Sequence, residues 1–290
     1  MPDLVTSSNF TMWDLFFTQK RKRLITSILL AAFCAVWVYP LIWMVSGSFK
    51  PNSELFQGTG LIPDSPTFSN YGRAWAEANM QRYFVNTLFV TIGSVVITTF
   101  SSALLGYVLG RRPLPGKIAI FGLMVFTLFI PQGYTIIPII QLLTMFGLGQ
   151  SLWGLMIATC GGSIVVFTLL FAGYFTQVPK ELEEASRMDG VGPFKTFWYV
   201  MLPLARPVVV TVVVLQSLQA WNDFLLPLVV TLANPKMRTL SVGIYSFKGE
   251  HYIDWGGMTA ASTIAIVPII ILFLILQRFF IDGLAGAVKG

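Results

Sequence analysis

The sequence predicts an all-α integral membrane protein with six transmembrane helices, and two features of its composition support this prediction. Hydrophobic residues make up 55% of the chain and charged residues 11%, whereas soluble domains carry about 25% charge. Long stretches carry no charge at all, and the longest of them covers residues 118–179. Because a membrane-spanning helix needs about 20 apolar residues, this stretch has room for two helices and a loop.

The individual spans follow from the charge-free stretches in chain order. Residues 24–49, 83–110 and 255–277 contain no charged side chain, and residues 207–235 contain only Asp223. Apolar stretches of this length indicate helices rather than strands. We therefore expect transmembrane helices over residues 24–47, 85–109, 118–139, 153–176, 204–229 and 258–281.

The two ends of the chain are expected to lie outside a transmembrane domain formed by residues 24–282. Residues 1–23 include the stretch NFTMWDLFF at 9–17, which is typical either of an amphipathic helix on the membrane surface or of a disordered tail. The basic cluster at 20–23 precedes an apolar run longer than the hydrophobic part of a signal peptide, so we interpret that run as the first span. Residues 283–290 form a C-terminal tail.

The distribution of basic residues predicts the orientation in the membrane. With six spans, thirteen of the nineteen Lys and Arg residues fall on the side that holds both termini, and six fall on the other side. Lys and Arg are enriched in cytoplasmic loops, so both termini are expected in the cytoplasm. The net charge of +6 is thus explained by topology and does not indicate nucleic-acid binding.

A search for catalytic patterns gives no support for an enzyme. The single histidine, His251, lies in a predicted outer loop without partner residues, and both cysteines lie inside predicted spans. The stretch GRRPLPGKI at 110–118 resembles a phosphate-binding loop, but it has five residues between the glycines instead of four and Ile118 in place of Ser or Thr. The chain is therefore not expected to bind a metal or to hydrolyse ATP itself.

One dense polar hairpin, residues 180–203, separates the fourth and fifth predicted spans. Acidic residues at 181, 183 and 184 fill the first turn of a short helix, where they complement the helix dipole. Glu183 and Arg187 are spaced for an ion pair along that helix. Gly190 suits the left-handed position that ends a helix, and Pro193 suits the start of a second helix.

The hairpin is either a docking element for a partner or an ordinary solvated loop. Asp189 lies at the negative end of the first helix, where a carboxylate is unfavourable in isolation. Ala185 and Ser186 have small side chains, so another surface can approach closely. Both features are explained if the hairpin docks into another protein, whereas acids that only promote solubility would suit a solvated loop.

The hairpin resembles the EAA motif of permease subunits of ATP-binding cassette (ABC) importers, roughly EAA-x3-G-x9-I-x-LP. Glu184-Ala185-Ser186 is followed after three residues by Gly190, and after nine more by Val200-Met201-Leu202-Pro203. Ser and Val are mild departures from this pattern. The form EEASRMDG is similar to the carbohydrate branch, which includes the maltose permease. The stretches AWND at 220–223 and QRFFIDGLAGAVKG at 277–290 resemble the same branch.

The resemblance implies a type I ABC importer permease in a bacterial or archaeal cytoplasmic membrane. It implies that the hairpin couples the chain to two cytoplasmic ATPase subunits or domains, which hold ATP and Mg, while this chain binds no cofactor. A second, non-identical permease and an extracytoplasmic solute-binding protein would complete the assembly within the lipid. The coupling residues it implies are Glu184, Ala185, Ser186, Asp189, Gly190, Leu202 and Pro203.

We expect three further sets of residues to take part in transport. The substrate path is expected to include some of Asn86, Gln132, Tyr134, Trp221, Asn222 and Asp223, although polar residues in spans also hold helices together. We expect Pro131 to interrupt the third span. The binding protein would contact Tyr245, His251, Tyr252 and Trp255 in the 230–257 loop, unless that loop is only solvated. The tail, with Lys289 and Gly290, either inserts between the ATPases or frays.

The predicted function is import of a sugar or oligosaccharide, driven by ATP hydrolysed on other chains. One alternative is import of another solute, such as a glycerol phosphate or a polyol. An ion-coupled carrier acting alone is a second alternative, and the scarcity of charges in the spans argues against it because such carriers use several ionisable groups.

Overall fold

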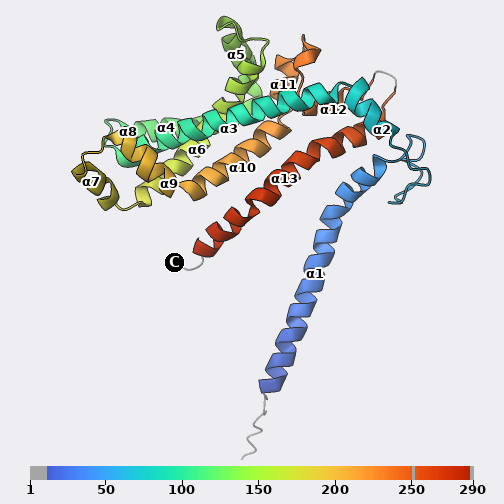
Figure 1. The fold of residues 1–290 in the computed structure, drawn as a ribbon, viewed down its shortest axis with the longest axis horizontal. Coiled ribbons are helices and arrows are strands. Elements are labelled where there is room, and N and C mark those ends of the chain that lie inside the picture. The colour runs from blue at the N-terminus through green and yellow to red at the C-terminus, as the bar shows by residue number, and fades with distance from the viewer. Residues whose placement is uncertain (1–11, 250–251, 288–290) are drawn as a thin grey trace, which may run out of the picture.

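The computed structural model describes residues 12–249 and 252–287, and every regular element in those residues is a helix (Figure 1). Two of the short elements, η1 and η2, are π-helical and η3 is a 3-10 helix. The elements in chain order are α1 (Met12–Gly47), α2 (Ser69–Gly72), η1 (Arg73–Glu77), α3 (Met80–Arg111), α4 (Lys117–Thr127), α5 (Gln132–Met145), α6 (Leu152–Gln177), α7 (Glu181–Met188), α8 (Pro193–Thr196), η2 (Phe197–Met201), α9 (Leu202–Leu204), α10 (Arg206–Asn222), α11 (Leu225–Val230), η3 (Pro235–Met237), α12 (Leu240–Tyr245) and α13 (Trp255–Ala287).

Several of these helices have the length and composition of membrane spans. Four single helices in the described residues qualify: Arg21–Gly47 of α1, all of α3, all of α6, and Trp255–Gln277 of α13. The bent pair Pro193–Leu204 and Arg206–Asn222 adds a fifth when it is counted as one span, and its two parts meet at 78°. The prediction of an all-α, multi-span membrane protein is confirmed.

The span predicted over residues 118–139 is formed by two shorter helices. α4 ends at Thr127 and α5 begins at Gln132, with Pro131 extended between them (φ −64°, ψ 128°). Proline disfavours the helical conformation in the residue before it, so the chain leaves the helix at this point. The interruption expected at Pro131 is therefore confirmed. The fifth predicted span breaks in a similar way, at an extended Asp223 (φ −62°, ψ 130°).

The core of the molecule is a bundle in which α3, α6 and α10 run side by side (Figure 1). Two glycines of α3, Gly106 and Gly110, face α6 so closely that a Cβ on Gly106 would lie 2.4 Å from the Cβ of Phe171. Small residues four apart allow two membrane helices to approach at backbone distance. The tight contact buries Phe171 and Phe175 completely and makes α3 and α6 the best-packed pair in the fold.

The first span, in contrast, has almost no packing partner within the chain. α1 diverges from the bundle and meets α13 only near the end of the molecule that holds α2 (Figure 1). Its apolar side chains are exposed along its length, for example Leu29 (65%), Val36 (71%) and Trp37 (68%). This helix surface is therefore available to lipid or to another chain.

The bundle has two distinct ends. α1 ends, and α3 and α13 begin, near α2, whereas α3 ends and α6 ends near α7 (Figure 1). The predicted hairpin thus lies at the end of the bundle that the charge bias assigns to the cytoplasm. The loops between α1 and α3 and between α12 and α13 lie together at the opposite end.

Candidate functional site

The hairpin has the local geometry that its sequence predicts. α7 ends in a Schellman motif, in which the backbone N–H of Val191 donates to the carbonyl of Ser186 (2.9 Å) and that of Gly190 to the carbonyl of Arg187 (3.0 Å). Gly190 adopts the left-handed conformation this turn requires, with φ +72°. Pro193 occupies the first turn of α8, also as predicted.

The second arm of the hairpin is fixed to the bundle by apolar packing. After α8 the chain forms the π-helical turn η2, which sends Phe197 and Met201 into the core beside α3 and α6, where both are fully buried. Leu202 packs against the same cluster, and Pro203 is exposed. The hairpin is therefore a continuation of the packed bundle rather than a loose loop.

The predicted coupling residues divide into an exposed and a buried group. Glu184, Ala185, Asp189 and Gly190 are exposed on the outer side of the hairpin. Ser186 is buried, and its hydroxyl donates to the carbonyl of Leu182 (2.9 Å). A docking partner can therefore reach the exposed group, whereas Ser186 packs within the chain.

The predicted ion pair between Glu183 and Arg187 is wrong. The structure turns Glu183 inward, where its Oε2 lies 3.0 Å from Nε of Arg111 at the end of α3. Arg187 remains exposed. The i, i+4 spacing favours an ion pair with Arg187 only if the carboxylate lies on the helix surface, and Glu183 is buried. Its actual partner, Arg111, is 72 positions away in sequence. The weak sequence signal for this contact is that Glu183 and Ser186 share the helix face opposite the exposed carboxylates.

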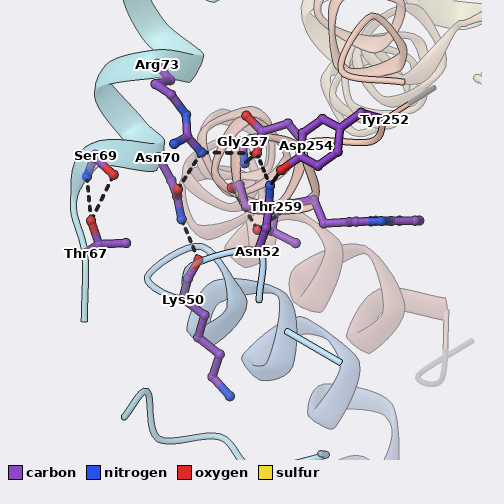
Figure 2. A network of polar contacts seen from close by, with 12 residues as sticks. Lys50, Asn52, Thr67, Ser69, Asn70, Arg73, Tyr252, Asp254, Gly257 and Thr259 are labelled. Atoms are coloured by element: carbon purple, nitrogen blue, oxygen red, sulfur yellow. Dashed lines mark hydrogen bonds and ion pairs between the residues drawn. The ribbon is translucent and has the colours of Figure 1, made fainter. Parts of the chain in front are cut away.

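A polar network ties the loops together at the other end of the bundle (Figure 2). Oδ1 of Asp254 accepts from Nη2 of Arg73 (3.1 Å), from Nδ2 of Asn52 (3.1 Å) and from the backbone N–H of Gly257 (3.0 Å). The last of these bonds caps the start of α13. Asn70 donates to the carbonyls of Ser48 and Lys50 (2.9 and 2.8 Å), which holds the end of α1 in place.

Replacing Asp254 with alanine should destabilise the outer end of the bundle. The variant loses a helix cap and leaves Arg73 and Asn52 without their shared acceptor, a change worth about 1–3 kcal/mol. Thermal unfolding of the purified protein should show a lower melting temperature. Asp64→Ala is the matched control, because the Asp64 side chain is exposed. Equal melting temperatures for the two variants would mean that the network does not stabilise the fold.

The residues predicted to contact a binding protein border this network. Tyr245, Tyr252 and Trp255 are exposed by 50%, 64% and 38%. The Tyr252 hydroxyl meets the amide of Asn52, and the Trp255 ring packs edge-on against Phe56, with ring centroids 5.3 Å apart. The rings of Tyr252 and Trp255 thus each contact the segment that follows α1. His251, like Lys289 and Gly290 in the tail and residues 9–11, lies outside the described residues. The rest of the 9–17 stretch belongs to the start of α1.

Two of the residues predicted to line the substrate path have structural partners. Asn86 is buried and donates to the backbone carbonyls of Lys236 and Arg238, both at 2.9 Å, so it fastens α3 to the outer loop. Trp221 is buried and donates from its ring to the carbonyl of Ala265 in α13 (3.0 Å). These bonds account for both side chains as contacts between elements.

The other substrate-path candidates lie at the interrupted helices. Tyr134, near the start of α5, is 80% exposed, Asn222 is exposed, and Asp223 occupies the break between α10 and α11. The side chain of Gln132 is outside the described set. A hollow of about 510 Å³ lies between the end of α5 and the segment after α11. Its lining is mostly apolar and includes none of the six predicted residues.

Comparison with known families decides what kind of membrane protein this is. Residues 16–285 match the family described as "Binding-protein-dependent transport system inner membrane component". The chain belongs to this family. It is therefore a multi-pass permease subunit of an inner-membrane transport system, and not an enzyme. The EAA resemblance of the hairpin agrees with this assignment.

Individual relatives and one solved structure extend the comparison. The permease is 31% identical to the diacetylchitobiose uptake system permease protein NgcG of Streptomyces coelicolor, over 94% of this chain and 89% of the relative. It is 32% identical to the arabinooligosaccharides transport system permease protein AraQ of Bacillus subtilis, over 88% and 92%. A chain from the crystal structure of a bacterial ABC transporter that imports the polysaccharide alginate superposes with a TM-score of 0.77, at 24% identity, over 93% and 99%. The last comparison supports the fold.

Proposed function

We propose that this permease imports a sugar or an oligosaccharide, powered by ATP that separate ATPase subunits bind with Mg and hydrolyse. The substrate class is supported by the relatives NgcG and AraQ, whose names specify diacetylchitobiose and arabinooligosaccharides. The proposal that import is coupled to ATP hydrolysis rests on the hairpin. It exposes a small, charged surface while its second arm is buried in the bundle.

The hairpin is suited to dock on an ATPase because its exposed face combines small and acidic residues. Ala185 and Gly190 leave room for a partner surface, and Glu184 and Asp189 supply carboxylates for basic groups on it. Pro203 and the half-buried Leu202 connect this face to the next span. ATP favours one conformation of the assembly only through different affinities for the two states, and the hairpin would carry that difference into the membrane.

A second, non-identical permease is proposed as the packing partner of α1. This span exposes apolar side chains on all sides, and none of its most apolar stretch is buried within the chain. A partner subunit and membrane lipid would share that surface. At the outer end, Tyr245, Tyr252, His251 and Trp255 are proposed to meet the solute-binding protein, and the tail with Lys289 and Gly290 to reach the ATPases.

The substrate path is proposed to run along the interrupted helices. Breaks in spans place polar groups inside the membrane where protein or water can satisfy them. Tyr134, Asn222 and Asp223 lie at such breaks, and Gln132 adjoins one of them. An aromatic ring together with directed hydrogen-bonding groups suits a sugar.

The first test is isolation of the assembly with this chain as bait from gently solubilised membranes, followed by mass spectrometry. Recovery of an ATPase and a second permease is the expected result. Reconstituted with its binding protein, the complex should import a sugar only when ATP is present. If the chain is recovered alone and moves solute in liposomes without ATP, the proposal is wrong and Asp223 becomes a candidate ion-binding residue.

A further inference from the structure

Arg111, the last residue of α3, joins three elements at the cytoplasmic end of the bundle. Its Nη1 donates to the carbonyl of Val178 (2.7 Å) and its Nη2 to that of Pro179 (3.3 Å), in the segment that follows α6. Its Nε bonds to Glu183 on α7 (3.0 Å). One guanidinium therefore holds the end of α3, the chain leaving α6 and the first helix of the hairpin.

Glu183 is equally well engaged. Its Oε2 takes the bond from Arg111 and its Oε1 accepts from the hydroxyl of Tyr107, one turn earlier on α3. Arg112 also donates to that hydroxyl (3.0 Å) and lies over the Tyr107 ring, 5.5 Å from its centroid. The side chains of Arg111 and Glu183 are only 4% and 9% exposed. The contact is therefore a buried, multiply bonded ion pair and not a surface pair screened by solvent.

Separating Arg111 from Glu183 is energetically costly because both side chains are buried. A charge left without its partner in such a site is strongly unfavourable, whereas an exposed pair separates at little cost. The bonds from the guanidinium to backbone carbonyls also fix its direction. α7 is consequently held against the ends of α3 and α6, although only residues 178–180 connect it to α6 along the backbone.

We propose that the Arg111–Glu183 ion pair, supported by Tyr107, is the positioning contact through which movement of the hairpin is passed to α3 and α6. This inference rests on the proposed coupling function. The exposed residues of the hairpin contact the ATPase, while Glu183 on the opposite face makes α7 move with the tightly packed α3–α6 pair. Without the ion pair, α7 loses its direct contact with α3, and its movement reaches the bundle only through the backbone and the buried second arm of the hairpin.

Glu183→Gln tests the proposal, because it removes the charge and nearly preserves the shape. In the purified complex with its binding protein, the ATPase should still co-purify, but the number of ATP molecules hydrolysed per solute imported should rise roughly tenfold, within the usual range of coupling between sites. The same contact would carry the signal from the binding protein to the ATPase, so stimulation of the ATPase by loaded binding protein should weaken as well. A purely structural role would lower the amount of complex and leave the ratio unchanged.

Glu181→Gln is the matched control, since Glu181 is an exposed carboxylate in the first turn of the same helix. It should keep the wild-type ratio. If Glu183→Gln does not assemble, Tyr107→Phe removes one bond to Glu183 and keeps the buried ring, and it should raise the ratio to a smaller extent. A wild-type ratio in an assembled Glu183→Gln complex, or in Tyr107→Phe where only that variant assembles, would overturn the inference. Failure of the wild-type chain to bind any ATPase would instead reject the coupling function itself.

Discussion

Gly190→Asp is expected to weaken binding of the ATPase to the permease by roughly tenfold and to abolish ATP-driven uptake. Gly190 has φ +72°, and a residue with a Cβ in the left-handed region costs about 1–2 kcal/mol. Apart from Gly190 and its two chain neighbours, no described residue has a heavy atom within 4 Å of the Cβ position, so the fold itself has room for the side chain. The new carboxylate would lie beside Asp189 on the exposed face, where two negative charges crowd the docking surface.

Gly190→Asn separates the two effects. Asparagine has nearly the same volume as aspartate and, like aspartate, can adopt the left-handed conformation, but it adds no charge. Co-purification and stimulated ATP hydrolysis should therefore be reduced less in Gly190→Asn than in Gly190→Asp. Wild-type stimulation of the ATPase by the aspartate variant would reject this surface as the coupling face. It would leave the family assignment unaffected.

The sequence predicted those parts of the fold that local chemistry determines. The spans follow from long charge-free stretches, and the end of α7 follows from a glycine that alone adopts a left-handed turn without strain. Pro131 marked the interruption between α4 and α5 for the same kind of reason, because proline restricts its own backbone and that of its neighbour. Each of these features depends on residues close together in the chain.

The parts that sequence analysis missed depend on contacts between distant elements. Glu183 was assigned to Arg187 on helix spacing, but its partner comes from the end of α3 and is chosen by burial. Asn86 and Trp221 looked like path residues because they are polar groups in spans. Their partners are backbone carbonyls of the outer loop and of α13, which carry no sequence signal. The polar side chains predicted that these residues would form hydrogen bonds or ion pairs, but the sequence did not identify their partners.

Gly106→Ala is expected to destabilise the close contact between α3 and α6. The new Cβ would lie 2.4 Å from the Cβ of Phe171, 2.9 Å from the backbone nitrogen of Ala172 and 3.0 Å from the carbonyl oxygen of Thr168. Two of these three atoms are backbone, so relief requires α3 and α6 to separate. Overpacking of this kind costs about 1–3 kcal/mol, and thermal unfolding should show a clear fall in melting temperature.

Gly161→Ala makes the same chemical change in α6 and is the matched control. Apart from the neighbouring backbone of α6, no described heavy atom lies within 4 Å of its Cβ position. The variant should therefore be as stable as wild type or slightly more so, because alanine favours the helix. Equal destabilisation by both substitutions would disprove the close-packing argument. If α3 and α6 move apart in Gly106→Ala, Arg111 and Glu183 separate as well. The effect of combining Gly106→Ala with Glu183→Gln on the transport ratio should then be smaller than the sum of the single effects, because both act on one contact.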